Sequence, residues 1–152
     1  MLKFFVRLYA RVFLGLIGSF YLPYYGVSVL IVKRIFPRFA WAQTFGDTIL
    51  VREDLARFSS SGPRTFCETF AHELVHVEQY RRLGTIRFFL SYLLSSLRAF
   101  LSGRDYYMEN ELEREAYQLQ SKYCEEHVKK HLEEVISEIE VVMMSSNGGK
   151  RS

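Results

Sequence analysis

The sequence predicts a single, mostly helical α+β domain organised around one central helix. Three observations indicate this fold class. A capped helix is expected over residues 64–83, apolar residues recur at helical spacing downstream of it, and only short runs of β-branched and apolar residues precede it. At 152 residues the chain can bury one hydrophobic core. We therefore expect one domain over residues 1–144 and a frayed tail over 145–152.

The central helix contains the sequence His-Glu-Leu-Val-His at positions 72–76. Residues four apart on an α-helix share a face, so His72 and His76 can both reach one zinc ion at about 2.0–2.1 Å. Glu73 projects about 100° away, close enough to reach a water molecule held by the metal. This spacing makes Glu73 the candidate catalytic base.

The ends and the opposite face of this helix agree with that interpretation. Ser61, Gly62 and Pro63 are typical of a helix start, and Gly84 follows two arginines as expected at a helix end. Bulky apolar residues cluster opposite the histidines, among them Phe70. One face is thus predicted to pack into the core while the other looks into a site.

Charge is distributed unevenly along the chain. Residues 1–104 carry 14 Lys and Arg and 6 Asp and Glu, whereas residues 105–152 carry 6 and 11, which gives net charges of +8 and −5. The basic part is also the apolar part, which favours a membrane surface as a partner over nucleic acid. We find no dense basic run or nucleic-acid motif and expect no nucleic-acid partner.

The only two cysteines, Cys67 and Cys124, lack CxxC spacing and imply no disulfide framework. Cys67 falls on the apolar side of the central helix and is expected to be a small buried residue. These observations favour a reducing compartment, and with the apolar basic half they predict a cytoplasmic or peripherally membrane-associated protein.

The apolar N-terminal segment, residues 1–36, allows two interpretations. Residues 12–32 are 21 residues without a charge, which is long enough to span a membrane as a helix. However, Pro23 and Gly26 indicate a turn within this run. We prefer a helix over residues 2–20 and a strand over residues 27–33.

Two further segments flank the central helix. A turn at Gly46 and Asp47 is expected to lead into a strand over residues 48–52, either an ordinary edge strand or a cleft edge that binds an extended peptide by strand addition. Residues 86–101 are apolar over most of a helical circumference. This segment is expected to be a core helix, with a membrane-facing helix or a lid as alternatives.

Catalytic zinc takes three protein ligands, so a third is expected beyond the two histidines. The only downstream segment rich in carboxylates opens a long helix predicted over about residues 106–144. Its chemically suitable residues are Glu109, Glu111, Glu113 and Glu115. His127 and His131 are also four apart, but they lie among charged residues without a following glutamate, and we do not expect them to bind metal.

Residues 71–79 and 113–117 together resemble the gluzincin metallopeptidases, and the small size resembles the minimal gluzincins. In that family a glutamate on a later helix completes the zinc site and is followed three residues on by a small residue. Glu113, with Ala116 at that position, fits this pattern, and Glu115 does not. The resemblance implies a zincin-like fold, a Zn²⁺ held by His72, His76 and Glu113, and Glu73 as base.

The resemblance further implies hydrolysis of peptide bonds in a peptide or protein substrate, with Tyr106 or Tyr107 as a possible extra oxyanion donor. This chain departs from the family at Tyr117, where an aspartate usually supports a ligating imidazole. Such supporting residues typically affect metal affinity or activity by about 10–100-fold. The departure keeps open an alternative, a zinc-stabilised, catalytically inactive membrane-associated binding module.

Overall fold

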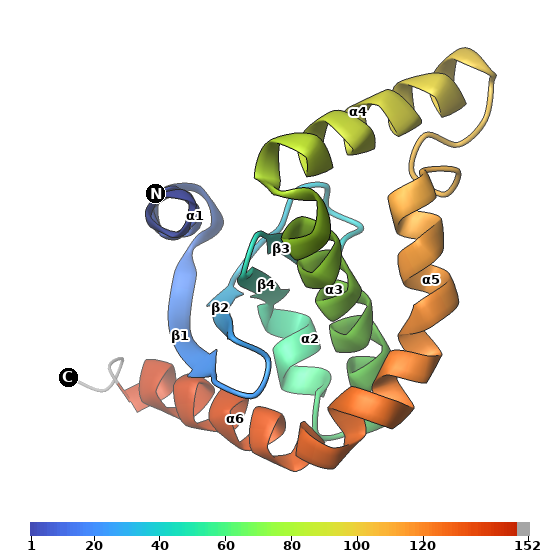
Figure 1. The fold of residues 1–152 in the computed structure, drawn as a ribbon. Helices are drawn as coiled ribbons and strands as arrows, with labels where there is room; N and C mark the ends of the chain where they lie inside the picture. The colour runs from blue at the N-terminus through green and yellow to red at the C-terminus, as the bar shows by residue number, and fades with distance from the viewer. Residues whose placement is uncertain (149–152) are drawn as a thin grey trace.

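A computed structural model of the chain describes residues 1–148 and shows an α+β fold in which helices surround one small sheet (Figure 1). The sheet has four strands in the order β1-β2-β4-β3. They are β1 (Leu16–Leu22), β2 (Val27–Val32), β3 (Ala42–Phe45) and β4 (Thr48–Arg52). The helices are α1 (Leu2–Tyr9), α2 (Glu53–Phe58), α3 (Pro63–Leu83), α4 (Thr85–Leu101), α5 (Glu111–Tyr123) and α6 (Leu132–Gly148). The predicted mostly helical α+β class is confirmed.

The sheet is mixed. Its central pair, β2 and β4, is parallel, and each outer strand pairs antiparallel with its neighbour. The β3–β4 hairpin closes through only Gly46 and Asp47, since Phe45 pairs with Thr48, and Gly46 has a φ of 61°. A two-residue hairpin loop requires positive φ, which glycine adopts without strain.

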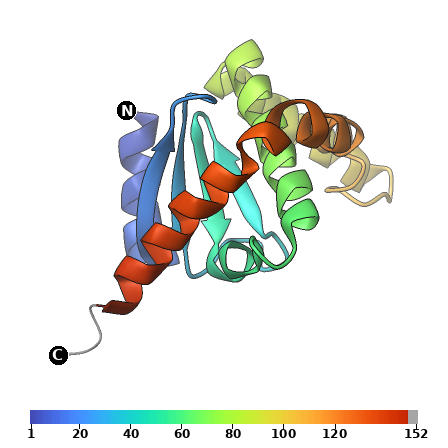
Figure 2. The same ribbon diagram turned by 90° about the horizontal axis from the view of Figure 1, so that it is seen from below.

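Both faces of the sheet are buried, which explains the continuous apolar sequence of β2. Figure 2 shows the sheet between α1 on one side and α3 on the other. Val29 and Ile31 face the main core, which α3 and α6 complete. The alternate residues Leu30 and Val32 face a second cluster with α1.

The predicted strands over 27–33 and 48–52 are present as β2 and β4, but the edge position expected for 48–52 was wrong. Strand β4 lies between β2 and β3, and β3 is the edge strand beside α3. The short sequence of β3 did not stand out because only four residues pair.

The predicted helix over residues 2–20 was also wrong in its second half. A π-helical turn, Ala10–Leu14, follows α1, and Gly15 then adopts a left-handed conformation with a φ of 69°. The chain leaves the helix there and continues as β1, which pairs with β2. Within residues 1–148, every helix is too short or too polar to cross a bilayer.

The long C-terminal helix expected over residues 106–144 is two helices. Asn110 caps α5, because its side-chain oxygen accepts a hydrogen bond from the backbone N–H of Leu112. After α5, a π-helical turn (Cys124–Val128) and a 3₁₀ turn (Lys129–His131) redirect the chain, and α6 packs along β1 (Figure 1). Residues 145–148 of the expected tail belong to α6, and 149–152 lie outside the described residues.

The expectation that residues 86–101 form a core helix was wrong. Helix α4 forms over nearly these residues, but it buries only Phe88, Ser95 and Ala99. Most of its leucine side chains are exposed, including Leu93 at 63%. Only one narrow face of the helix packs against the rest of the molecule, so most of its apolar side chains are exposed to solvent.

The two cysteines form a disulfide, which corrects the expectation that they stay unpaired. Cys67 on α3 bonds to Cys124 at the end of α5, with Cα atoms 5.5 Å apart. Both side chains are buried, as expected for Cys67. The expected reducing compartment rested on unpaired cysteines, and the disulfide removes that basis.

Candidate metal centre

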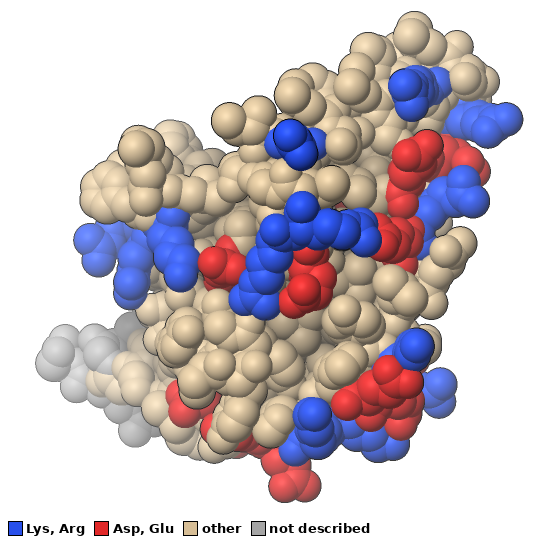
Figure 3. Space-filling view, viewed as in Figure 1, with Lys and Arg blue, Asp and Glu red and all other residues tan. Residues whose placement is uncertain are grey.

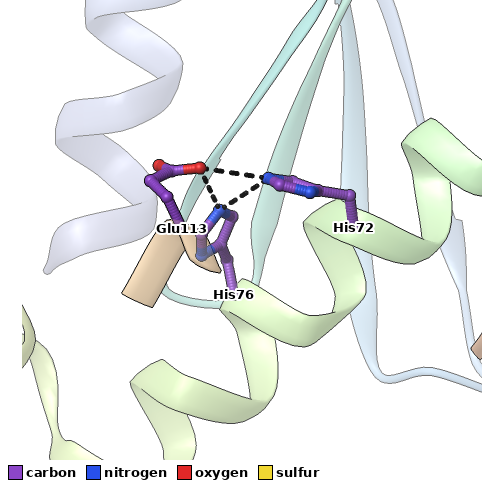
Figure 4. Close-up of side chains that lie close together, drawn as sticks. All are labelled: His72, His76 and Glu113. Atoms are coloured by element: carbon purple, nitrogen blue, oxygen red, sulfur yellow. Dashed lines mark hydrogen bonds and ion pairs between the residues drawn. The ribbon is translucent and has the colours of Figure 1, made fainter. Parts of the chain in front are cut away.

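The central helix α3 presents the predicted residues at the centre of the molecule. His72 and His76 project from one face of α3 toward α5, and Glu113 in the first turn of α5 points back at them (Figure 4). All three side chains are buried. Among the residues that the structure describes, these three form the only group of His, Cys, Asp and Glu side chains arranged to hold a metal ion.

The separations of the three facing atoms match those of ligands on a zinc ion. Nε2 of His72 lies 3.1 Å from Nε2 of His76 and 3.2 Å from Oε2 of Glu113. Nε2 of His76 lies 3.5 Å from the same oxygen. Two ligand atoms bound tetrahedrally to one Zn²⁺ would be separated by about 3.3 Å. The three separations are therefore compatible with ligands of a single metal ion.

Hydrogen bonds on the far side of each imidazole favour a metal-binding tautomer. Nδ1 of His76 lies 2.8 Å from Oε1 of Gln79. The orientation of the Gln79 amide is fixed, because its Nε2 donates to the carbonyl of Leu112 and to Glu115. Nδ1 of His76 must therefore donate its hydrogen to Gln79, which leaves Nε2 facing the other two ligand atoms.

His72 also has a glutamine partner at its far nitrogen. Its Nδ1 lies 3.2 Å from Oε1 of Gln120 on α5. Tyr117, the departure from the family pattern, packs edge-on against the His72 ring with centroids 4.6 Å apart. The polar support for this imidazole thus comes from Gln120, one turn further along α5, while Tyr117 supplies an apolar wall.

When both histidines carry their hydrogen on Nδ1, the two Nε2 atoms and Oε2 of Glu113 are all acceptors, so a cation or an additional proton at this point stabilises the cluster. Burial lowers the pKa of His76, but the hydrogen bond to Glu113 and the charges of Glu73 and Glu113 outweigh it and raise that pKa to about 9. Burial raises the pKa of Glu113, but hydrogen bonds with His72 and His76 bring it well below its usual range. A protonated His76 therefore places positive charge at the position where the three side chains could hold a metal ion.

The carboxylate of Glu113 is also oriented through Oε1, the oxygen that does not face the histidines. The hydroxyl of Tyr92 on α4 donates to its Oε1 at 3.0 Å. Burial and the charge of Glu113 raise the pKa of Tyr92, so this hydroxyl keeps its proton. The side chain of Asn110 donates to the Tyr92 carbonyl and to Ser96, which fastens the start of α5 to α4.

Glu73 lies beside the cluster and belongs to the same pocket. Its Oε2 accepts a hydrogen bond of 2.7 Å from the hydroxyl of Thr44 on the edge strand β3. The pocket has a volume of about 420 Å³ and is lined by Glu73, His76 and Glu113 together with mainly aromatic side chains. The arrangement places a carboxylate that could accept a proton beside a group that could hold a metal ion, at the wall of a cavity large enough for an aromatic or aliphatic side chain.

The other acidic and histidine candidates lie apart from the cluster. Glu115 binds Arg82 and Gln79, while Glu109 and Glu111 are exposed. His131 stacks on Tyr24, with ring centroids 4.2 Å apart, and His127 is exposed.

Four supporting residues were not predicted from the sequence: Thr44, Gln79, Tyr92 and Gln120. Gln79 had a detectable signal, because it follows His76 by three residues and so lies beside it on the helix. Gln120 follows Glu113 by seven residues, two turns along the same face. Thr44 and Tyr92 come from other elements, and their positions depend on the tertiary fold. Tyr106 and Tyr107, predicted as oxyanion donors, line the pocket.

Comparison with models of known protein families, with curated proteins and with solved structures finds no match for this chain. The resemblance to gluzincins therefore rests on the two short sequence motifs.

Proposed function

We propose that this protein is a zinc-dependent metallopeptidase of the gluzincin type. One observation carries the proposal: His72, His76 and Glu113 converge on one point at zinc-ligand separations, and Glu73 lies beside them in an open pocket. Two nitrogen ligands and one carboxylate oxygen form the donor set typical of hydrolytic zinc sites. No fourth potential protein ligand joins this group in residues 1–148, which fits a catalytic site better than a closed structural one.

The donor set fits zinc, and the His-Glu-x-x-His spacing on one helix favours zinc over iron, which can take the same donors. Imidazole nitrogens with one carboxylate suit Zn²⁺, whereas Mg²⁺ and Ca²⁺ prefer oxygen ligands throughout. When bound, zinc would supply Lewis-acid chemistry by polarising a carbonyl group and lowering the pKa of a water molecule. His72, His76 and Glu113 would hold it, with Gln120, Gln79 and Tyr92 fixing their orientations.

The remaining steps belong to residues of the chain. Glu73 would accept a proton from the attacking water and transfer it to the leaving amine, as the only other carboxylate of the pocket besides Glu113. Thr44 holds the Glu73 carboxylate by donating to Oε2. Burial and the charge of Glu113 raise the pKa of Tyr107, which therefore keeps a proton available for donation to an oxyanion.

The edge strand β3 offers a place for the substrate backbone. It pairs only with β4, and Gln43, Thr44 and Phe45 line the pocket from this strand. An extended peptide could pair with such an edge and place one side chain in the aromatic part of the pocket. These features support peptide hydrolysis in particular and favour an apolar side chain next to the cleaved bond.

Metal content of the purified protein tests the first half of the proposal. We expect about one zinc per chain in the wild type and strong loss of zinc in His76→Ala and in Glu113→Ala. Glu109→Ala is the matched control, because Glu109 is exposed and outside the cluster. Folded wild-type protein that takes up no zinc would contradict the proposed centre.

Glu73→Gln tests the second half. The variant keeps the shape of the side chain but cannot accept a proton, so zinc should remain bound while cleavage of an unfolded, dye-labelled protein is lost. Loss of zinc in this variant would show that Glu73 is a ligand and not the base. A wild type that binds zinc but cleaves no peptide would instead support the non-hydrolytic binding module.

A further inference from the structure

We propose that helices α1 and α4 dock the protein on an anionic lipid bilayer. In Figure 1, α4 lies along the top and α1 at the upper left, both away from α6 at the bottom. Their exposed apolar residues form what we call the docking surface, represented by Phe4, Phe5 and Leu8 of α1 and Leu90, Leu93 and Leu97 of α4. The proposal concerns docking alone and does not depend on peptide hydrolysis.

Helix α4 has the side-chain distribution of a helix that lies in a membrane interface. With Phe88 at zero and 100° per residue, the buried Ser95 and Ala99 fall within about 20° of it. The exposed leucines and phenylalanines occupy about 100–240°, and Arg87 and Arg98 follow at about 260–280°. One narrow face of α4 thus packs against the rest of the protein. The broad opposite face is apolar, and the two arginines border this apolar face.

Helix α1 repeats this arrangement. Its buried Val6 packs on the sheet. With Val6 at zero, Lys3 and Arg7 lie at about 60–100°, and Phe4, Phe5 and Leu8 lie at about 160–260°. These three apolar side chains are each about half or more exposed, with Phe4 at 68%. Two helices far apart in sequence therefore present the same combination of a free apolar sector and a basic border.

The positive charge of the segments that contain α1 and α4 favours an anionic lipid surface as the partner of the docking surface. Residues 1–46 contain six Lys and Arg and no Asp or Glu, and residues 85–104 contain three arginines and no acidic residue. Figure 3 shows the upper margin as mainly tan side chains bordered by blue ones, with red side chains below it. Nine positive charges in these segments exceed the net charge of the whole chain, +3, so the remainder is acidic.

The basic borders of the two helices disfavour a second copy of the chain as the occupant. A symmetric dimer through this face would bring Lys3, Arg7, Arg87 and Arg98 of one copy close to the same residues of the other, whereas anionic lipid headgroups would neutralise them. Peripheral membrane helices combine two contributions to binding. Their apolar residues enter the acyl region, and their basic residues stay among the headgroups.

The docking surface continues into the pocket of the metal centre. Phe36 and Phe39 are more than half exposed, and both line that pocket. Phe89 of α4 lines it from the other side. Docking through α1 and α4 would therefore set the pocket mouth close to the headgroups, within reach of chains that emerge from the bilayer.

Flotation of the 152-residue protein with lipid vesicles tests the proposal. We expect strong binding to phosphatidylcholine vesicles containing about one third phosphatidylserine and much weaker binding to pure phosphatidylcholine. Arg87→Gln with Arg98→Gln should weaken binding to the anionic vesicles roughly twentyfold, since each basic residue near such a surface is worth about fivefold. Leu93→Gln with Leu97→Gln should weaken it about tenfold or more.

Matched controls come from the opposite side of the molecule. Val141→Gln with Met144→Gln replaces two exposed apolar residues of α6, and Lys122→Gln with Lys130→Gln removes two exposed positive charges. Both control pairs should bind like the wild type. Absence of vesicle binding, or equal binding to neutral and anionic vesicles, would overturn the proposal. So would a dimer in solution that Leu93→Gln with Leu97→Gln converts to monomer, because a second copy would then cover the surface.

Discussion

Oε1 of Gln79 accepts a hydrogen bond from Nδ1 of His76 at 2.8 Å. Gln79 is itself held by α5, where the Leu112 carbonyl and the Glu115 carboxylate accept its two amide hydrogens, each at 2.9 Å. Arg82 of α3 completes the chain of contacts by pairing with Glu115. The same residues that join α3 to α5 therefore set the tautomer and orientation of a candidate metal ligand.

Gln79→Leu should weaken zinc binding by about 10–100-fold. The leucine has a similar volume but cannot accept the Nδ1 hydrogen, so the His76 ring loses both its orientation and its preferred tautomer. Competition with a coloured zinc chelator measures the change. Gln118→Leu on the exposed face of α5 is the control and should bind zinc like the wild type. Unchanged affinity in folded Gln79→Leu would mean that packing alone orients the imidazole.

Tyr92→Phe should weaken zinc binding by roughly 10–150-fold, because a hydrogen bond to a charged group is worth roughly 1.5–3 kcal/mol. The change removes only the hydroxyl that donates to Oε1 of Glu113. Isothermal titration with zinc compares it with Tyr106→Phe, the same substitution at an exposed residue of the same pocket. Equal losses in both variants would indicate a general effect on the pocket and contradict a specific role for Tyr92.

The sequence predicted the local parts of the centre because local spacing determines them. His72 and His76 must share a face on any α-helix, and the cap and glycine signals placed that helix over residues 64–83, within one residue of the observed α3. The resemblance to gluzincins selected Glu113 among four glutamates of one segment, and the structure places that residue beside both histidines.

The sequence could not predict the parts that depend on contacts between distant elements. Residues 16–20 are apolar enough for either a helix or a strand, and pairing with β2 decides the outcome. Helix α4 is apolar on almost every side, so its composition alone could not show which face is covered. Cys67 and Cys124 are 57 residues apart, and only the packing of α3 against the end of α5 brings them together.

Removal of the disulfide should lower the free energy of unfolding by about 4 kcal/mol, the chain-entropy value for a loop of 57 residues. Urea denaturation of Cys67→Ala with Cys124→Ala measures this loss in the presence of a chelator, so that metal binding does not contribute. Reducing agent should destabilise the wild type similarly and leave the double variant unchanged. Equal stability of the oxidised wild type and the variant would contradict the prediction.

The metal-free protein should lose stability as the pH rises from about 6.5 to 9. His76 has a folded-state pKa of about 9, above its ordinary value of 6.5, because its contacts with Glu113 outweigh burial. Its contribution is therefore fully present below pH 6.5 and is lost as the pH rises through 9. Glu113 contributes in the opposite sense, but its pKa is lowered, so that contribution is lost only in acid.

Urea denaturation with a chelator at pH 6.5, 8 and 9.5 should show the free energy of unfolding falling by up to a few kcal/mol. His127→Asn should show the same fall, since that side chain is exposed, whereas His76→Asn should lack it. Saturating zinc should abolish the fall, because a metal ion that replaces the His76 proton binds more tightly as that proton becomes easier to remove. Metal-free stability that stays level or rises over this range would show that His76 is already neutral, and that its contacts with Glu113 do not outweigh the cost of burying its charge.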